Sequence, residues 1–355
     1  MRDYFLGGAS PAGFETAFWH DHQNAFGFYL KGGPGTGKST LLKKLAAAFS
    51  AESVSVYHCA SDPHSLDAVV LEDRGIFAAD ATAPHEASTP LPGITGCMTD
   101  LAEGLHADLL LPHKQEILSL YQENQAAHAC AKKGFAGIGA MEDAAAEIGL
   151  SALDHPKLLH FARRFAKRLL PADACAPAVM HDRQAAAITP LGRCMLIPDG
   201  FDRILLQDPA FAASEYLLQT LADAAANAGV PCEITRSQTR TNRPPVLLLL
   251  PSLHLAVITD AADDSGCGNP EPQKPVSVIR MQRFYDPAIL RDHRNLLRFC
   301  RKTAGTITAQ TVKLLMQALR IHDALESYYI RAIDHAFLDA KADAIISAVK
   351  NHRFL

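Results

Sequence analysis

The most informative stretch of the chain is residues 26–50, which read FGFYLKGGPGTGKSTLLKKLAAAFS. The first six residues are mainly apolar and predict a strand. From about Gly37 onward, Leu41, Leu42 and Leu45 share one face at helical spacing, which predicts a helix. The glycines between these segments permit a tight turn, since glycine adopts backbone angles that other residues rarely reach. The stretch therefore predicts a strand, a glycine-rich turn and a helix in succession.

The turn fits the pattern G-x-x-x-x-G-K-[ST], known as the P-loop or Walker A motif. In such a loop successive N–H groups point inward and form an anion-binding nest, and the helix N-terminus adds partial positive charge. Because the pattern lies between a strand and a helix, as the motif requires, a glycine turn without a ligand is the less favoured interpretation. The predicted nucleotide-binding residues are Gly32, Gly33, Pro34, Gly35, Thr36, Gly37, Lys38, Ser39 and Thr40.

Acidic residues at strand ends are candidates for completing this site. We predict that Lys38 reaches the β- and γ-phosphates and that Ser39 and Asp80 hold Mg²⁺. Asp80 ends the apolar segment GIFAAD, and Asp73 is the second choice. No glutamate follows Asp80, so the usual ATPase arrangement of an adjacent catalytic base is missing. A turn or capping role is the alternative for any strand-end aspartate.

A polar run, HCASDPHSLD, follows the predicted strand at residues 54–59. Asp62 is a candidate catalytic residue there, because its carboxylate could accept a proton from a substrate hydroxyl, as a kinase requires. Its neighbour is a proline, and Asp-Pro is also typical of an ordinary turn. His58 is a second candidate to face the attacking group. His58, His64 and His85 could share a metal ion, although a group of histidines is weak support for a metal site.

The second half of the chain repeats the first. The strand at 28–31 is echoed at 204–207, and LLKKL at 41–45 is echoed by LLQTL at 217–221, both with a shift of 176 residues. The strand that ends at Asp80 is echoed by LAVITD, with a shift of 180. Strands alternating with helices predict an α/β fold, with two P-loop NTPase-like units that are each a mainly parallel sheet flanked by helices. The predicted domains are residues 1–178 and 179–355.

The phosphate loop is degenerate in the second unit. With the shift of 176, Gly32 becomes Asp208, Lys38 becomes Ser214 and Ser39 becomes Glu215. A glutamate that points into the nest would repel phosphate, and no lysine compensates. We therefore predict a single nucleotide site, in the first unit.

Composition narrows the class of protein. The 355 residues include 34 Lys+Arg and 38 Asp+Glu, and 48% are hydrophobic, which favours a packed core and argues against a nucleic-acid or anionic-lipid binder. We see no bilayer-spanning run and no secretory signal. The eight cysteines are scattered without a C-x-x-C pair and are interpreted as reduced thiols. These features predict a cytoplasmic protein without a membrane or nucleic-acid partner.

Two later segments carry weaker signals. HFARRFAKRLL at 160–170 is typical of an amphipathic helix with a solvated basic face, although one arginine could contact a γ-phosphate. His322 and Glu326 lie four residues apart, a spacing more typical of a pair on a helix surface than of a metal site.

Several stretches together resemble an uncharacterised group of bacterial tandem P-loop proteins that are usually described only as ATPases. They are FYLKGGPGTGKSTLLKKLA, YHCASDPHSLDAVV and FAADATAPH in the first half, and AITPLG and IHDALESYY in the second. The resemblance implies a duplicated P-loop NTPase fold with its nucleotide site at residues 32–40, and it favours Asp80 over Asp73 as the strand-end acid. The second unit departs from this pattern, which argues against a mechanism with two ATP molecules.

The sequence thus predicts a Mg²⁺-dependent P-loop NTPase that binds and hydrolyses ATP and acts with an unidentified small-molecule or protein partner. Two alternatives stay open. An ATP-dependent small-molecule kinase would turn over only with an acceptor, through Asp62. A nucleotide-sensing module would bind ATP or ADP without turnover, which the missing glutamate after Asp80 would explain.

Overall fold

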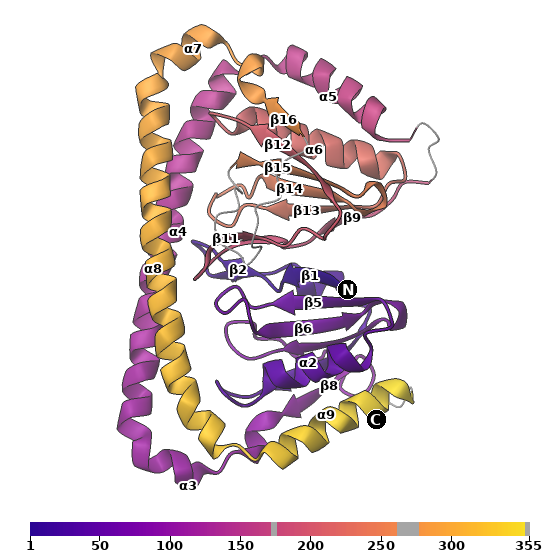
Figure 1. Ribbon diagram of the computed structural model, residues 1–355, viewed down its shortest axis with the longest axis vertical. Helices are drawn as coiled ribbons and strands as arrows, with labels where there is room; N and C mark the ends of the chain where they lie inside the picture. Colours follow the sequence, from indigo (N-terminus) through magenta and orange to yellow (C-terminus); the bar gives the residue numbers. More distant parts are fainter. Residues whose placement is uncertain (172–175, 261–276, 352–355) are drawn as a thin grey trace. The chain divides into compact units, whose positions relative to one another are not determined.

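The computed structural model describes residues 1–171, 176–260 and 277–351 (Figure 1). It contains two compact units. Unit 1 comprises residues 1–7, 16–130 and 313–355, and unit 2 comprises residues 8–15 and 131–312. The predicted repeats divide the chain at residue 178 instead. Each compact unit therefore combines segments from both halves of the sequence.

Unit 1 is built on a six-stranded mixed sheet that is parallel at three of its five pairings. In sheet order the strands are β1 (Arg2–Phe5), β5 (Val54–His58), β6 (Leu66–Leu71), β7 (Ile76–Asp80), β4 (Phe26–Lys31) and β8 (Gly96–Asp100). Only β6 runs against its neighbours, because the short connection at 72–75 can reverse the chain but cannot cross over the sheet. The sheet is therefore mixed, and β6 begins at the edge where β4 and β7 end.

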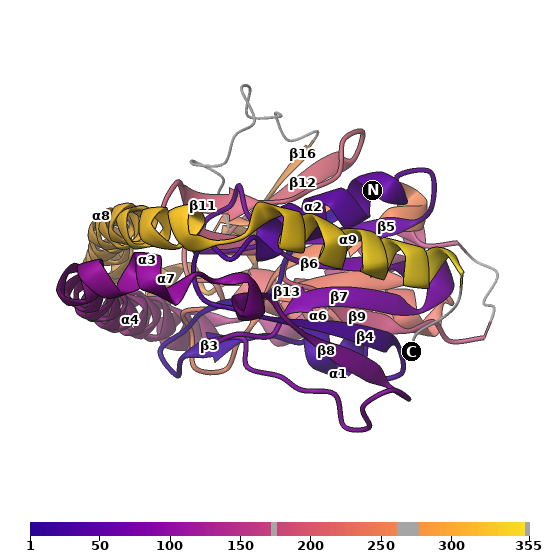
Figure 2. The ribbon, with the colours of Figure 1, turned by 90° about the horizontal axis from the view of Figure 1, so that it is seen from below.

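Helices cover the unit 1 sheet, and one of them comes from the end of the chain. Helix α2 (Lys38–Ala48) buries its three leucines against the sheet in a core that also contains Ala342, Ile345 and Val349 of α9 (His335–Lys350). Figure 2 shows α9 beside α2. Asp334 caps α9 by accepting hydrogen bonds from the first-turn N–H groups. The remaining helices of unit 1 are α1 (Phe18–Asp21), α3 (Ala107–Leu110) and parts of α4 (Lys114–Ala152) and α8 (Arg294–Ala332).

Unit 2 has a sheet with the same sequence of strand directions. The edge strand β16 (Ser277–Arg280) corresponds to β8 of unit 1. After it in the sheet come β12 (Asp202–Gln207), β15 (Leu255–Thr259), β14 (Pro245–Leu250), β13 (Cys232–Arg236) and β9 (Met180–Asp182). The predicted α/β class with two sheet-bearing units is confirmed. Unit 2 also contains two hairpins, β2 (Gly8–Ala9) with β3 (Phe14–Glu15) and β10 (Ala186–Thr189) with β11 (Gly192–Met195), and the helices α5 (His155–Leu169), α6 (Ala212–Asn227) and α7 (Pro287–Asp292).

The repeats exchange their last helices. Helices α4 and α8 are each 39 residues long and start 180 residues apart. In unit 1, Leu105 bridges to Ile333, and in unit 2, Leu153 bridges to Tyr285, the same pair shifted by 180 and reversed. As a result α9 packs on α2 in unit 1, and α5 packs on α6 in unit 2. The final helix of each sequence half completes the core built around the sheet of the other half.

The structure also bears on the predictions about membrane-spanning segments and about the cysteines. None of the helices within the described ranges is long and apolar enough to cross a membrane. Cys59, Cys97, Cys130, Cys232 and Cys300 are free thiols as predicted, but Cys194 is disulfide-bonded, so the interpretation of all eight as reduced is wrong. Cys175 and Cys267 lie outside the described residues.

Candidate active site at the glycine-rich loop of unit 1

The glycine-rich loop (residues 32–37) joins β4 to α2. Gly35 and Gly37 have φ angles of 68° and 80°, in the left-handed region that residues with a side chain rarely adopt. A Cβ atom on Gly32 would lie 2.4 Å from the Thr36 hydroxyl oxygen. The path of the backbone into the first turn of α2 thus requires glycine at positions 32, 35 and 37.

Lys38, the first residue of α2, and Asp80, the last residue of β7, come together beside the loop. The Lys38 ammonium lies 3.7 Å from an Asp80 carboxylate oxygen, and it donates hydrogen bonds to the carbonyl oxygens of Gly32 (2.7 Å) and Gly33 (2.8 Å). Both side chains are largely buried, with 13% and 14% exposed. They meet because β4 and β7 are adjacent and parallel, so that their carboxyl ends share one edge of the sheet.

The other residues predicted for the site differ in their hydrogen bonds and in their exposure to solvent. The Ser39 hydroxyl oxygen accepts a hydrogen bond from the Leu66 N–H (3.0 Å), whereas Thr40 is exposed. Asp80 accepts a hydrogen bond from the Thr82 N–H (2.8 Å). Asp73 is exposed in the turn between β6 and β7, at the end of β7 opposite Asp80. The strand directions therefore favour Asp80 as the acid beside the loop.

A buried pair of side chains, Asp67 and His85, lies beside Asp80. The sequence offered His85 only as a possible metal ligand and did not single out Asp67. An Asp67 carboxylate oxygen is 3.4 Å from His85 Nε2. Burial, followed by the negative charge of Asp80, raises the pKa of Asp67 to about 8. Burial lowers the pKa of His85 to about 4. The signal in the sequence was one aspartate inside the otherwise apolar strand LDAVVL. Because β6 runs antiparallel to β7, this aspartate at the start of β6 lies at the edge of the sheet where β7 ends.

Asp62 and His58 take part in the local structure of the β5–β6 connection. The Asp62 carboxylate accepts hydrogen bonds from the His64 N–H (3.2 Å) and the Ser65 hydroxyl, which is the geometry of a turn. His58 Nε2 lies 2.9 Å from an Asp3 oxygen. Both carboxylate oxygens of Asp62 thus accept hydrogen bonds within the turn.

The metal site of His58, His64 and His85, for which the sequence offered only weak support, is not observed. In the part of the chain that the structure describes, the only His, Cys, Asp and Glu side chains grouped closely enough for a metal ion are His322, Asp323 and Glu326 on α8.

Helix α8 also contacts the glycine-rich loop directly. The Glu326 carboxylate accepts a hydrogen bond from the Gly35 N–H at 3.0 Å. A Cβ atom on Gly35 would lie 2.8 Å from the Glu326 carbonyl oxygen, and one on Gly33 would lie 3.7 Å from the Tyr329 ring. The sequence predicted that Glu326 forms a helix surface pair with His322, and it contained no signal for this contact across 291 residues.

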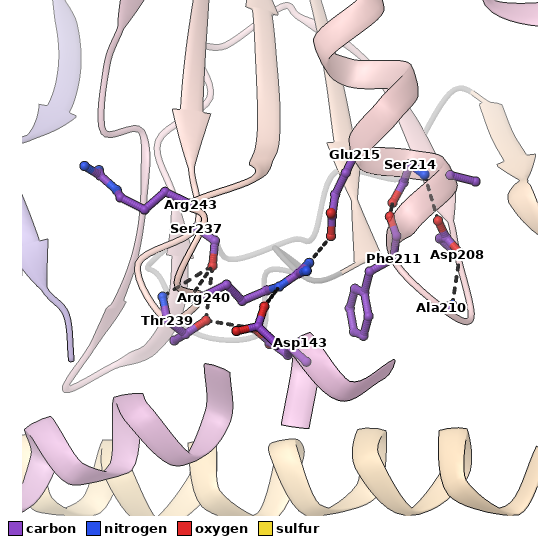
Figure 3. A network of polar contacts seen from close by, with 12 residues as sticks. Asp143, Asp208, Ala210, Phe211, Ser214, Glu215, Ser237, Thr239, Arg240 and Arg243 are labelled. Atoms are coloured by element: carbon purple, nitrogen blue, oxygen red, sulfur yellow. Dashed lines mark hydrogen bonds and ion pairs between the residues drawn. The ribbon is translucent and has the colours of Figure 1, made fainter. Parts of the chain in front are cut away.

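The corresponding loop of unit 2 is closed by its own carboxylate (Figure 3). Asp208 is fully buried and accepts hydrogen bonds from the N–H groups of Ala210 (3.0 Å) and Ser214 (2.7 Å). The Tyr285 hydroxyl donates to the same carboxylate at 2.8 Å. The Ala210 N–H in the loop and the Ser214 N–H in the first turn of α6 thus bind a carboxylate of the chain itself.

Glu215 does not point into this nest. It forms an ion pair with Arg240, which also donates to Asp143 at 2.7 Å (Figure 3). The predicted repulsion of phosphate by Glu215 is therefore wrong in its mechanism, because Asp208 is the residue that occupies the nest.

The predicted shift of 180 residues between the repeats also needs correction at the end of β15. Leu30 pairs with Asp80 and Leu206 pairs with Thr259, so the counterpart of Asp80 is Thr259.

No protein-family model matches the chain, and no curated protein or solved structure matches it either. The function must therefore be argued from the residues of the site.

Proposed function

We propose that unit 1 binds a Mg²⁺–nucleoside triphosphate, with ATP as the substrate, and hydrolyses its terminal phosphate. The observation that carries this proposal is the succession of β4, the glycine-rich loop and α2, with Lys38 3.7 Å from Asp80. A cation, a nest of N–H groups and a carboxylate at one sheet edge are the groups that phosphoryl transfer uses.

Phosphate binding would use donors that are already in place. The loop N–H groups and the N-terminus of α2 provide partial positive charge. Lys38 now donates to two loop carbonyl oxygens. In the complex its ammonium would turn from these oxygens to the β- and γ-phosphates, where it would stabilise the charge of the transferring group.

The oxygen donors near Lys38 fit Mg²⁺, which prefers hydroxyl, carboxylate and water oxygens. Ser39 and Asp80 would hold the ion. The Ser39 hydroxyl oxygen keeps acceptor capacity, since it accepts only the Leu66 N–H among the bonds described. When bound, Mg²⁺ would neutralise charge that develops on the phosphate oxygens.

Asp67 and His85 are the buried acid–base groups available to orient an attacking water. They favour hydrolysis over transfer to an acceptor hydroxyl. The kinase alternative relies on Asp62, and both carboxylate oxygens of Asp62 accept hydrogen bonds within the turn. We therefore place the kinase second.

The test is Mg²⁺-dependent phosphate release from ATP by the purified protein. We expect release by the wild type and a loss of at least about 100-fold in Lys38→Ala, because the mutation removes charge that stabilises the transition state. Lys43→Ala is the matched control, since Lys43 is exposed on the same helix, and it should behave as wild type. Tight ATP binding without release would indicate the sensing module, and a folded protein that does not bind ATP would refute the proposal.

A further inference from the structure

We propose that the Glu326 carboxylate occupies the glycine-rich loop as an anion when no nucleotide is bound. An incoming phosphate must displace it, so that Glu326 sets the nucleotide affinity of the site. The inference rests on the proposed function. It concerns a residue on α8, outside the motif that identified the loop.

The geometry places Glu326 on one of the donors that a phosphate would need. Its carboxylate accepts the Gly35 N–H at 3.0 Å, and its backbone and Cγ lie within about 3 Å of the position of a Gly35 Cβ. Glycine at position 35 thus permits both the left-handed turn and the close approach of α8. A phosphate oxygen and the Glu326 carboxylate cannot both occupy the acceptor position at this N–H group.

Charge adds to this steric competition. A carboxylate beside a bound triphosphate is a like charge at short distance, and partial burial keeps the repulsion from being fully screened. Binding therefore requires the Glu326 side chain to move away. The affinity measured in the wild type includes the free energy of that movement.

Unit 2 shows what a permanent internal anion looks like. Asp208 is fully buried and accepts from two N–H groups and the Tyr285 hydroxyl. Glu326 is only half-buried and accepts from one N–H group of the loop. The position 180 residues before Glu326 is Ala146, so this carboxylate has no counterpart in the other repeat. A single contact from a half-buried side chain can be exchanged for a ligand, whereas the buried Asp208 network cannot.

The experiment compares the dissociation constants of Mg²⁺–ATP for four proteins by calorimetry: wild type, Glu326→Gln, Glu326→Ala and Asp343→Asn. Glu326→Gln keeps the size of the side chain and removes its charge, and we expect it to bind ATP about tenfold more tightly. Glu326→Ala should change the affinity in the same direction. Asp343→Asn removes an equal charge from an exposed position on α9, in the same unit, and should bind like the wild type.

The outcomes separate the two proposals. If the wild type binds ATP and both Glu326 variants bind with equal or weaker affinity, the role of Glu326 is refuted and the proposed function stands. If tightening occurs equally in Asp343→Asn, general surface charge explains it and the inference again fails. If no variant binds ATP, the proposed function itself fails. Binding is measured rather than turnover, so that an additional catalytic role of Glu326 would not obscure the result.

Discussion

The loops after β4 and β12 are the two regions of this protein that are most usefully compared. Each follows the strand next to the outermost strand of its sheet, and each leads into a helix. In unit 1 the loop contains four glycines, and one N–H group is held by Glu326 from a distant helix. In unit 2 the first residue of the loop is Asp208, whose carboxylate satisfies the N–H groups from within.

The difference shows that a nest of N–H groups at a helix start needs an anion but does not determine its source. Where the anion is a buried side chain, it becomes part of the core and the site closes. Where it is a half-buried glutamate, we propose that an external phosphate competes for the same donor. Three predictions, in order of decreasing effect, test this comparison.

Removing the internal anion of unit 2 should have the largest effect on stability. We expect Asp208→Ala to lower the free energy of unfolding by about 3–5 kcal/mol, because it leaves buried donors without partners. Denaturant unfolding followed by circular dichroism measures this. Asp223→Ala, at an exposed position on α6, is the control and should lie within about 0.5 kcal/mol of wild type. An equally small effect of Asp208→Ala would mean that the carboxylate does not hold the loop together.

The Asp67–His85 pair should make the stability depend on pH, and this pair belongs to unit 1 alone, since Val246 stands at the position of Asp67 in unit 2. Between pH 3.8 and about 8 the native Asp67 keeps a proton that the unfolded chain loses, so stability falls as pH rises. Between about pH 4 and 6.5 the unfolded His85 binds a proton that the native one lacks, so stability rises with pH.

The two contributions to the pH dependence oppose each other up to pH 6.5. Above pH 6.5, Asp67 is the member of the pair that still makes stability fall as pH rises. We therefore expect the unfolding free energy to fall by about 2 kcal/mol from pH 6.5 to 8 in metal-free buffer. Denaturant titrations at several pH values measure this slope. In Asp67→Asn most of the slope should disappear, leaving the smaller contribution of Glu215, whose pKa burial raises to about 7. A mutant that keeps the wild-type slope would show that another group is responsible.

The smallest effect should come from the position in unit 2 that corresponds to Lys38. The Ser214 hydroxyl donates to the Phe211 carbonyl oxygen at 2.7 Å, so Ser214→Ala should cost about 1 kcal/mol of stability. Phosphate release from ATP should be unchanged, in contrast to Lys38→Ala. A loss of release in Ser214→Ala without unfolding would show that unit 2 contributes to turnover and would break the comparison.

Much of the fold could be predicted because its signals are local. The glycine pattern predicted the turn between β4 and α2, and the spacing of three leucines predicted the buried face of α2. The repeat predicted a second sheet, and the structure has one with the same strand order. Asp80 could be placed near Lys38 because adjacent parallel strands end at one edge.

The remaining site residues could not be assigned, because their roles depend on chain direction and on distant partners. Asp67 faces the site only because β6 runs antiparallel to β7, and periodicity within a strand does not report its direction. Cys194 shows the same limit, since scattered spacing does not reveal a disulfide bond.

Neighbouring residues alone specify the local order of strand, glycine-rich loop and helix, its repetition, and the loss of lysine from the second loop. The backbone angles of glycine and the spacing of apolar side chains suffice to produce these features. The folded structure, in contrast, selected the anion that meets each loop: Glu326 from 291 residues away in unit 1, and Asp208 in unit 2. It also decided that the repeats exchange their last helices, since a helix with one apolar face does not specify which sheet it covers.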